Sequence, residues 1–405
     1  MPAETNSVEK FKKSDLGFLR DYNTKKILRI LRDTGSASRA GMAETAQLDR
    51  KTVTNITQQL LSGGYIVPVS KERAEGGRPR EMLSLKGDFM RVIGIDIGGT
   101  HISGVLMDFS GKTLADFTTT IDSDTDADTQ IKLCELTVER LISRAGLSIE
   151  DISEIGIAFP GYYDSVTDSM ILSENFPKWK NINIKKVFEE KYGIPIYVDD
   201  CSQLMALAEL WYGEVKSHNF LVFDLGYGIG CAIVIGGRIY KGVGGKAGEI
   251  GHTTADVNGP ECTCGKHGCI ESLASGWALA LQAGNTLDGD PILKELVKLP
   301  EKISVKDIVI AAQLGSEKCR KYLSDAGRYL AMGISNAMTL FNPEKVIIGG
   351  RLINDNEILW NSIINEVKKE TVPVIYGDTA ISQSKLGEYA SAIGAAALCM
   401  QRYFE

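Results

Sequence analysis

One glycine-rich stretch, residues 248–272, restricts the possible folds of this chain more than any other part of the sequence. It reads GEIGHTTADVNGPECTCGKHGCIES and holds four nitrogen and sulfur donors in the pattern H-x9-C-x-C-x4-C, namely His252, Cys262, Cys264 and Cys269. Four such donors complete a tetrahedral zinc shell and leave no coordination position for water. We therefore predict a structural Zn2+ that braces the loop, with Glu249 and Glu271 flanking it.

The cysteines of this stretch could instead be buried thiols that happen to cluster. Three of the eight cysteines of the chain fall within eight positions, in a loop broken by glycines and preceded by a histidine, which favours a metal site. The spacing is not that of a C2H2 finger or a zinc ribbon. The other five are scattered through apolar or helical contexts, as reduced thiols of a cytosolic protein are: Cys134, Cys201, Cys231, Cys319 and Cys399.

The composition is that of globular material. The chain has 405 residues, of which 43% are hydrophobic, enough for two or three domains. The N-terminal residues lack the apolar core of a signal peptide, and no stretch reaches the ~18 apolar residues that a membrane span needs. We expect a cytoplasmic protein without membrane insertion.

Charge is distributed unevenly along the chain. The net charge is −7, but residues 1–90 hold 16 Lys+Arg against 11 Asp+Glu, or +5, which leaves 29 against 41, or −12, for residues 91–405. A basic head on an acidic body predicts a polyanionic partner for the head only.

The head, residues 1–88, is predicted to contain three short helices joined by tight turns. The first is capped by Asn23 and ends near Gly35, the second covers 38–46, and Asp49 caps the third. Apolar residues recur at helical spacing, and we expect them to face a common core: Ile27, Ile30, Leu31, Met42, Ala43, Val53, Ile56 and Leu60. This order of helices is typical of a helix-turn-helix.

The polar residues of the head fit a DNA-binding surface. The third helix would expose side chains able to reach phosphates and base edges, namely Lys51, Thr52, Thr54, Asn55 and Gln58. Residues 65–67 and 82–85 predict two strands of a wing, and Arg78 and Arg80 lie between them, suited to a minor groove. The alternative is a solvated basic loop on a small protein-interaction module. Helix lengths, wing and charge sign favour double-stranded operator DNA.

From Arg91 onward, glycine turns stand at the ends of apolar strands. RVIGIDIGGTHISGVLMD predicts a hairpin, FLVFDLGYGIGCAIVIGGRIY repeats the design, and 346–352 adds a third glycine-rich strand end. Three such turns favour an α/β fold with two similar lobes that face a cleft, as in actin-like sugar kinases.

The chain resembles the ROK family (repressors, open reading frames, kinases) over essentially its whole length. The resemblance is carried by the head and by DIGGT at 96–100, AFPG at 158–161, SENFPKW at 173–179, VDDCSQLMALAE at 198–209, DLGYGIG at 224–230, the zinc run and IIGGRL at 347–352. It implies an N-terminal winged helix-turn-helix followed by a two-lobed, actin-like (ribonuclease H-like) sugar kinase fold. We place the domains at 1–88, 89–205 plus 385–405, and 206–384.

In this family a sugar lies between the lobes, and the resemblance implies which residues would hold it here. The matching positions are Asn175, Asp200, Glu249, His252 and Glu271, with His252 also a zinc ligand. Carboxylates and amides around a braced loop suit a polyhydroxylated ligand. For Asn175 and Glu249 the alternative role is loop capping.

Several positions depart from the pattern of ROK kinases. Those kinases need a carboxylate base to take the proton from the attacking sugar hydroxyl, and Cys201 stands at that position. A thiol with a pKa of ~8.5 is mostly neutral at pH 7. The phosphate loops are also degenerate: they comprise Asp96, Gly98, Gly99, Thr100, Gly226, Tyr227 and Gly228. Tyr227 stands where threonine is usual, Arg351 where a third glycine is usual, and His101 follows the first turn.

The simplest interpretation is a sugar-responsive repressor that has lost phosphoryl transfer and is not an enzyme. An active sugar kinase with a fused DNA-binding domain is the alternative, and it would need Asp200 to act as the base. A regulator controlled by a protein partner is a third hypothesis.

Paired DNA half-sites and the family resemblance predict a homodimer or higher homo-oligomer. The helix expected at 316–343 carries small residues that would suit an interface or a lobe core. The last helix, from Gly387, is expected to cross back onto the first lobe.

Overall fold

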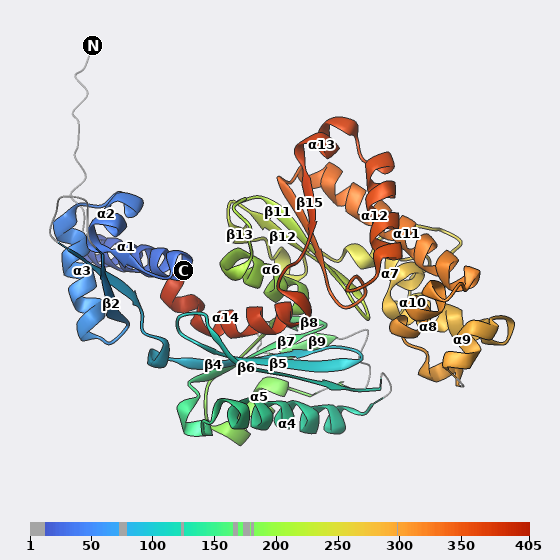
Figure 1. Ribbon diagram of the computed structural model, residues 1–405, viewed down its shortest axis with the longest axis horizontal. Helices are drawn as coiled ribbons and strands as arrows, with labels where there is room; N and C mark the ends of the chain where they lie inside the picture. The colour runs from blue at the N-terminus through green and yellow to red at the C-terminus, as the bar shows by residue number, and fades with distance from the viewer. Residues whose placement is uncertain are drawn as a thin grey trace, which may run out of the picture. The chain divides into compact units, whose positions relative to one another are not determined.

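The computed structural model describes residues 13–72, 79–122, 125–164, 169–172, 179, 182–297 and 299–405 (Figure 1). The chain divides into two compact units. Unit 1 consists of the chain up to Arg91 together with Asp108–Lys112 and Met400–Glu405, and unit 2 holds the remainder. The division of the body into separate domains at 205/206 and 384/385 stays a prediction.

Unit 1 contains the three predicted helices, α1 (Lys13–Thr34), α2 (Arg39–Ala46) and α3 (Arg50–Ser62). The predicted cap of α3 is confirmed, because the Asp49 carboxylate accepts a hydrogen bond from the Thr52 amide at 2.9 Å. Between α2 and α3, Gln47 takes a left-handed conformation with φ of 53°. The predicted core residues Met42, Val53, Ile56 and Leu60 are buried, as expected.

The predicted start of the first helix is wrong. Asn23 lies inside α1, which begins ten residues earlier at Lys13. Asparagine is a good helix cap, but in a helix interior it costs less than 1 kcal/mol relative to alanine. A single asparagine therefore marks a possible helix start and does not exclude a longer helix.

Three strands complete this part of unit 1. β2 (Ile66–Glu72) and β3 (Arg80–Leu85) are antiparallel, and β1 (Ala37–Ser38) pairs with β3 on its other side. The segment between β2 and β3 includes Arg78, which lies outside the described residues.

Unit 1 also contains one aromatic cluster that sequence reasoning did not predict. Its members are Tyr65, Phe89, Phe109, Tyr403 and Phe404. The ring centroids of Phe89 lie 4.4 Å from Tyr65 and 4.9 Å from Phe109, and Phe109 lies 5.3 Å from Tyr403. These separations are typical of favourable aromatic pairs. The Arg29 Nε donates a hydrogen bond to the carbonyl of Phe404, so the end of the chain is fixed to α1.

Unit 2 contains two five-stranded sheets of the same design, as the repeated glycine turns predicted. The first sheet has the order β10 (Ile196–Asp200), β7 (Glu154–Phe159), β4 (Arg91–Ile97), β5 (His101–Asp108), β6 (Thr113–Thr120). The second has the order β15 (Ala380–Gln383), β14 (Lys345–Gly349), β11 (Phe220–Leu225), β12 (Ile229–Ile235), β13 (Arg238–Ile239). In each sheet a three-stranded meander is followed by two parallel strands.

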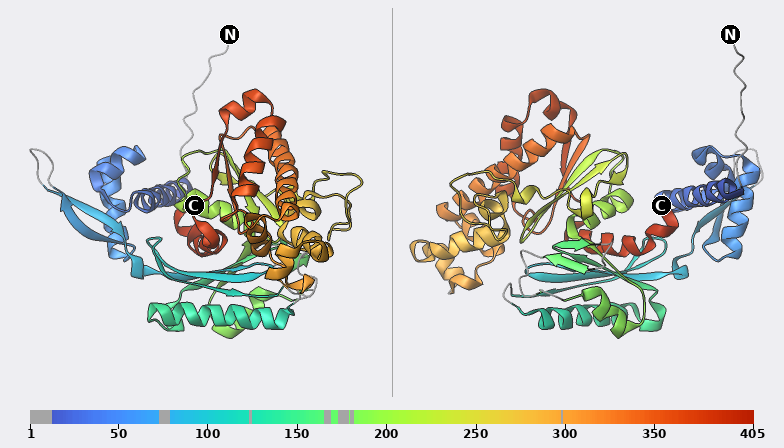
Figure 2. Two further views of the ribbon diagram at one scale, coloured as in Figure 1. Left: turned by 45° about the vertical axis from the view of Figure 1, so that its right-hand side comes forward. Right: turned by 180° about the vertical axis from the view of Figure 1, so that it is seen from behind.

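The predicted path of the last helix is confirmed. α14 (Ala390–Phe404) lies against the first sheet on the face opposite α4 (Ala127–Ala145) and α5 (Ile184–Tyr192) (Figures 1 and 2). A Cβ atom on Gly94 of β4 would lie 1.9 Å from the carbonyl oxygen of Ala392. Only glycine permits so close an approach of helix and strand.

The helix α6 (Cys201–Tyr212) joins the two sheets. It packs on β11 and β12 of the second sheet. It also meets α14, because a Cβ atom on Gly394 would lie 1.8 Å from the carbonyl oxygen of Leu204. The N-terminus of α6 therefore stands where the lobes face each other, as does the start of α14.

The long helix α11 (Glu317–Phe341) forms part of the second lobe's core. Its small residues Ala326, Gly327 and Ala331 are buried. A Cβ atom on Gly327 would lie 2.4 Å from the Cβ of Ser362 in α12 (Glu357–Glu370). These residues therefore serve packing within the chain, one of the two roles that the sequence left open.

The remaining helices of the second lobe are α7 (Ile270–Ala274), α8 (Gly276–Asn285), α9 (Pro291–Leu296), α10 (Val305–Gln313) and α13 (Pro373–Asp378). Among the described residues, every helix is too short or too polar to traverse a lipid bilayer.

Candidate functional site

The four predicted zinc donors come together in one cluster. Their ligand atoms, from His252, Cys262, Cys264 and Cys269, all lie within 4.8 Å of one another. The Cys262 Sγ lies 3.6 Å from the His252 Nδ1, and the Cys264 Sγ lies 3.7 Å from the Cys269 Sγ. Sulfur atoms bound to one tetrahedral Zn2+ at 2.3 Å stand about 3.8 Å apart, so the spacing fits a zinc shell.

The backbone of the loop holds these donors in place. The Cys262 amide donates to the Lys266 carbonyl at 2.7 Å, and Thr254 forms an isolated β-bridge with Cys269. Gly268 has a φ of 64°, and a Cβ atom there would lie 1.5 Å from the Asp256 carbonyl oxygen. The turn therefore requires glycine at this position.

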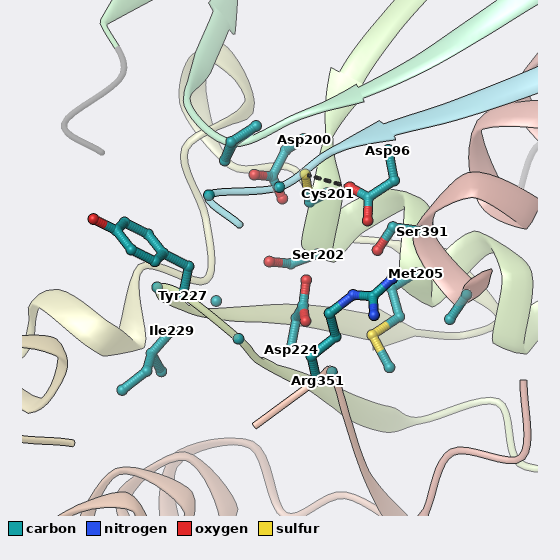
Figure 3. A pocket seen from close by; sticks show the side chains of 18 of the residues that line it. Asp96, Asp200, Cys201, Ser202, Met205, Asp224, Tyr227, Ile229, Arg351 and Ser391 are labelled. Carbon is teal, nitrogen blue, oxygen red and sulfur yellow. Dashed lines mark hydrogen bonds between the residues drawn. The ribbon is translucent and has the colours of Figure 1, made fainter. Parts of the chain in front are cut away.

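A cavity of about 180 Å3 lies between the two lobes of unit 2. It is lined by the turn after β4, the N-terminus of α6, the turn between β11 and β12, the loop that carries the predicted zinc donors, the segment after β14 and the start of α14. In Figure 3 the side chains of Asp96, Asp200, Asp224 and Arg351 point toward the same space.

Most of the predicted site residues line this one cavity. They are Asp200, Glu249, His252 and Glu271 from the predicted sugar site, Cys201 from the base position, and Asp96, Gly98, Gly99, Thr100, Gly226, Tyr227 and Gly228 from the phosphate loops. Their assigned roles stay predictions. Asn175 lies outside the described residues.

The Glu271 carboxylate is buried in the first turn of α7 and is held by two donors. It accepts a hydrogen bond from the Ile229 amide at 2.8 Å and one from the Trp277 indole at 3.5 Å. Because Ile229 begins β12 and Cys269 precedes α7 directly, the same glutamate connects the glycine turn of the second sheet to the cluster of predicted zinc donors.

The residue at the predicted base position, Cys201, is a thiol whose surroundings favour the protonated form. Cys201 is the first residue of α6, is buried, and its Sγ lies 3.5 Å from the Asp96 carboxylate, to which it donates. Burial, and then the charges of Asp96, Asp200 and Asp224, raise the pKa of the Cys201 thiol well above its usual value. A group that holds its proton this firmly cannot accept one from a sugar hydroxyl.

The carboxylates around Cys201 are also perturbed. Asp200 caps α6, its Oδ1 accepting from the Gln203 amide at 3.0 Å. Burial, followed by the charges of Asp199 and Asp224, raises the pKa of Asp200 to about 7. Burial raises the pKa of Asp224 to about 7, with a further contribution from Asp96. Burial likewise raises the pKa of Asp96 to about 6, opposed by the Cys201 hydrogen bond and by Arg351.

Two large side chains, Tyr227 and Arg351, also line the cavity. The Tyr227 ring packs on the first glycine turn, since a Cβ atom on Gly99 would lie 2.3 Å from the Tyr227 Cγ. The Arg351 guanidinium forms an ion pair with Glu388 at 2.5 Å and donates to the Ser103 hydroxyl at 2.8 Å. Since Ser103 belongs to β5 and Arg351 follows β14, this arginine connects the two lobes.

The histidine after the first glycine turn is neutral. Burial, and then the nearby Arg351, lower the pKa of His101 to about 4. Its Nδ1 lies 2.8 Å from the Thr100 hydroxyl. His101 therefore adds no positive charge to the cavity at neutral pH.

Comparison with known proteins identifies the family of the chain. The family model described as "ROK family" matches residues 92–402. The chain belongs to the ROK family. It is 29% identical to the xylose repressor of Bacillus spizizenii over 393 residues, which cover 97% of this chain and 98% of that relative.

Two solved structures of ROK proteins resemble the chain. One is a ROK family transcriptional regulator described as a homologue of the E. coli MLC protein, with a TM-score of 0.76, 25% identity, and coverage of 95% of this chain and 97% of that one. The other is a ROK family glucokinase from Streptomyces griseus in complex with glucose and AMPPNP, with a TM-score of 0.68, 27% identity, and coverage of 77% and 99%.

Two residues that line the cavity of this ROK protein were missed from the sequence, Glu388, which pairs with Arg351, and Ser391, in the first turn of α14. Ser103, which accepts a hydrogen bond from Arg351, was missed as well. None of them belongs to a recognisable motif. Only Gly387, next to Glu388 before the final helix, hinted at a functional turn.

Five of the predicted DNA-contacting residues lie on one helix of unit 1, α3. Lys51, Thr54, Asn55 and Gln58 are exposed on α3. The hydroxyl of Thr52 is half-buried and donates to the Asp49 carboxylate. Arg80 is exposed at the start of β3. A shallow groove runs between α1 and α3, and Asn55 and Gln58 line it.

Proposed function

We propose that the protein is a sugar-responsive transcriptional repressor whose unit 1 binds operator DNA and whose cavity binds a sugar without phosphorylating it. The observation that carries the proposal is the protonated thiol of Cys201 where a ROK kinase requires a carboxylate. The similarity to a xylose repressor along almost the entire length of both chains supports it.

Unit 1 acts as a winged helix-turn-helix. α2 and α3 are joined by a tight turn at Gln47, and β2 and β3 form the wing. α3 would enter the major groove, where Lys51 and Asn55 reach phosphates and base edges. Arg80, together with Arg78, would follow the adjacent minor groove. A homodimer presents two such helices to two half-sites.

The part of the cavity that is lined by Asp200, Glu249 and Glu271 binds the sugar. Asp200, Glu249 and Glu271 offer carboxylate oxygens that accept hydrogen bonds from hydroxyl groups, with His252 beside them. Asn175 completes this set. A sugar held by both lobes would stabilise one lobe arrangement over another and so change the affinity of the dimer for DNA.

A structural Zn2+ is held by His252, Cys262, Cys264 and Cys269. The distances among the donors and the burial of Cys262 and Cys269 support this assignment. When bound, the ion supplies a rigid cross-link and no reactive water, because four protein ligands complete its shell. The residues of the loop then keep Glu271 and Glu249 oriented toward the sugar.

The alternative function is an active sugar kinase, and the similarity to a ROK family glucokinase supports this alternative. Asp200 would have to be its base. Its Oδ1 is already used in capping α6, which argues against that role. A coupled ADP-release assay with hexoses, pentoses and N-acetylhexosamines separates the two functions. The repressor proposal expects no sugar-dependent ADP release.

The repressor proposal is tested by DNA selection. Genomic fragments that the purified protein retains would be labelled, and fluorescence anisotropy would measure their affinity with and without each sugar. We expect at least one sugar to weaken binding about tenfold or more, the scale of an allosteric coupling. An affinity that no sugar changes would remove the sensing function.

The DNA surface is tested separately. Replacing Lys51 on α3 with alanine should weaken binding to all fragments and reduce the salt slope by about one. Lys318→Ala, on the exposed start of α11 in unit 2, is the matched control. Equal salt slopes for both variants would reject α3 as the DNA-binding element.

A further inference from the structure

The charged lining of the cavity is almost entirely acidic. Six carboxylates line it, from Asp96, Asp200, Asp224, Glu249, Glu271 and Glu388. Among the described residues of this lining, Arg351 alone carries a permanent positive charge. His101 is neutral at pH 7 because its pKa is lowered. A Zn2+ bound to three thiolates would carry one net negative charge, so the metal would add no positive charge.

The single guanidinium is already engaged. Its two terminal nitrogens contact the Glu388 carboxylate and the Ser103 hydroxyl at 2.5 and 2.8 Å. This ion pair is partly exposed, so it contributes little to stability. It nevertheless neutralises the positive charge of Arg351. An anion that binds Arg351 must first displace the Glu388 carboxylate, which would then remain beside the anion and repel it.

Two places where backbone donors bind phosphate in other proteins are obstructed here. The Tyr227 ring packs against Gly99 in the first glycine turn. The N-terminus of α6 is capped by Asp200, whose carboxylate accepts from the Gln203 amide. An anion at either place would meet a ring or a carboxylate instead of free N–H groups.

The position of Cys201 locates the hydroxyl that a kinase would phosphorylate. If the sugar lies as the proposed function requires, this hydroxyl faces Cys201. Asp96 lies 3.5 Å from the Cys201 Sγ, and the charges of Asp200 and Asp224 act on the same thiol. A phosphate on that hydroxyl would therefore stand beside Asp96, Asp200 and Asp224, in a cavity whose walls screen charge poorly. Their raised pKa values of about 6, 7 and 7 leave these carboxyls partly ionised at neutral pH, and each ionised one repels the phosphate.

We propose that Arg351, Glu388 and Tyr227 determine ligand specificity, so that the cavity admits an unphosphorylated sugar and excludes its phosphate ester. This inference rests on the proposed function and narrows it: the effector is a substrate of a sugar kinase reaction and not its product. Carboxylates accept hydrogen bonds from neutral hydroxyls without penalty, whereas a phosphate dianion is repelled.

Matched ligand pairs test the inference by isothermal titration calorimetry. The pairs are xylose with xylose 5-phosphate, glucose with glucose 6-phosphate, and N-acetylglucosamine with its 6-phosphate, all at one ionic strength. We expect the free sugar of the recognised pair to bind at least about tenfold more tightly than its phosphate. The same samples would be measured for operator release by fluorescence anisotropy.

The outcomes separate the inference from the proposed function. A phosphate that binds as tightly as its free sugar, or more tightly, overturns the inference and leaves the repressor in place. If no member of any pair binds or releases DNA, the sensing function fails and the inference fails with it.

A variant tests the mechanism of exclusion. Glu388→Gln removes one carboxylate and frees the Arg351 guanidinium, so we expect the preference for the free sugar to fall several-fold. Glu317→Gln, exposed in the first turn of α11 and outside the cavity, is the matched control and should keep the wild-type preference. An unchanged preference in Glu388→Gln, with a wild-type melting temperature, would contradict the role of the ion pair.

Discussion

Asp200 and Cys201 are neighbours in sequence, and burial changes the chemistry of both. The thiol keeps its proton because its pKa is raised well above the usual value. The carboxyl of Asp200, with a pKa of about 7, is only partly ionised at neutral pH. The two residues differ as candidate bases. The thiol of Cys201 keeps its proton, whereas the pKa of Asp200 would suit a base and only its engagement as the cap of α6 argues against that role.

The raised pKa of Asp200 predicts a pH dependence of stability. The unfolded carboxyl titrates near 3.8 and the folded one near 7, so the folded protein binds more protons in this window and loses stability as pH rises through it. Urea unfolding should show that Asp200→Asn, which keeps the cap, loses less stability than the wild-type protein as the pH rises from about 4 to about 7. Parallel curves would contradict the raised pKa.

The cysteine cluster predicts one Zn2+ per chain. Cys264→Ala should reduce the zinc content, measured by inductively coupled plasma mass spectrometry, and should lower the melting temperature because a cross-link is lost. His267→Ala removes an exposed histidine of the same loop that lies outside the four-donor cluster. It should keep the zinc. Equal zinc content in the two variants would reject the proposed ligand set.

Glycines determine how closely the helices approach the sheets of unit 2. Gly94 and Gly156 lie on neighbouring strands, β4 and β7, and both face α14. A Cβ atom on Gly156 would lie 1.9 Å from the Ala395 carbonyl oxygen, which is backbone and cannot rotate away. The two glycines therefore determine the position of the helix whose first turn lines the cavity.

Gly156→Ala should destabilise unit 2 by about 2 kcal/mol or more, the usual cost of overpacking a well-filled contact. The matched control is Gly377→Ala in α13, where nothing lies within 4 Å of the added Cβ and alanine favours the helix. Differential scanning calorimetry should show a lower melting temperature only for the first variant. A Gly156→Ala protein as stable as wild type would disprove the tight packing of α14.

Elements with strong local signals were predicted well from the sequence. Asp49 caps α3 as expected, because a capping side chain bonds to an amide three residues away. Ser38, predicted only as the start of the second helix, caps α2 in the same way. The start of α1 was wrong, because a long helix tolerates an asparagine that resembles a cap. The ion pair of Arg351 with Glu388 and its bond to Ser103 could not be predicted, since they join residues from separate elements far apart in sequence.

At the scale of the whole molecule, unit 2 repeats one sheet design twice and places its acidic cavity between the copies. The repeat was visible in the sequence as glycine turns at strand ends. Unit 1 could not be outlined from the sequence alone, because it includes the last turn of α14 and the turn at Asp108–Lys112. Its aromatic cluster is built from three separate stretches of the chain, represented by Tyr65, Phe109 and Tyr403.

The central claim is that this cavity binds a sugar and transfers no phosphate. The most direct measurement is ADP release by the purified, zinc-loaded protein with ATP, Mg2+ and each sugar that alters its binding to DNA. We predict no release above the sugar-free background for the wild-type chain, because Cys201 holds its proton and the glycine turn is covered by Tyr227. Sugar-dependent turnover at about 1 s−1 or faster, a rate typical of enzymes, would contradict the account.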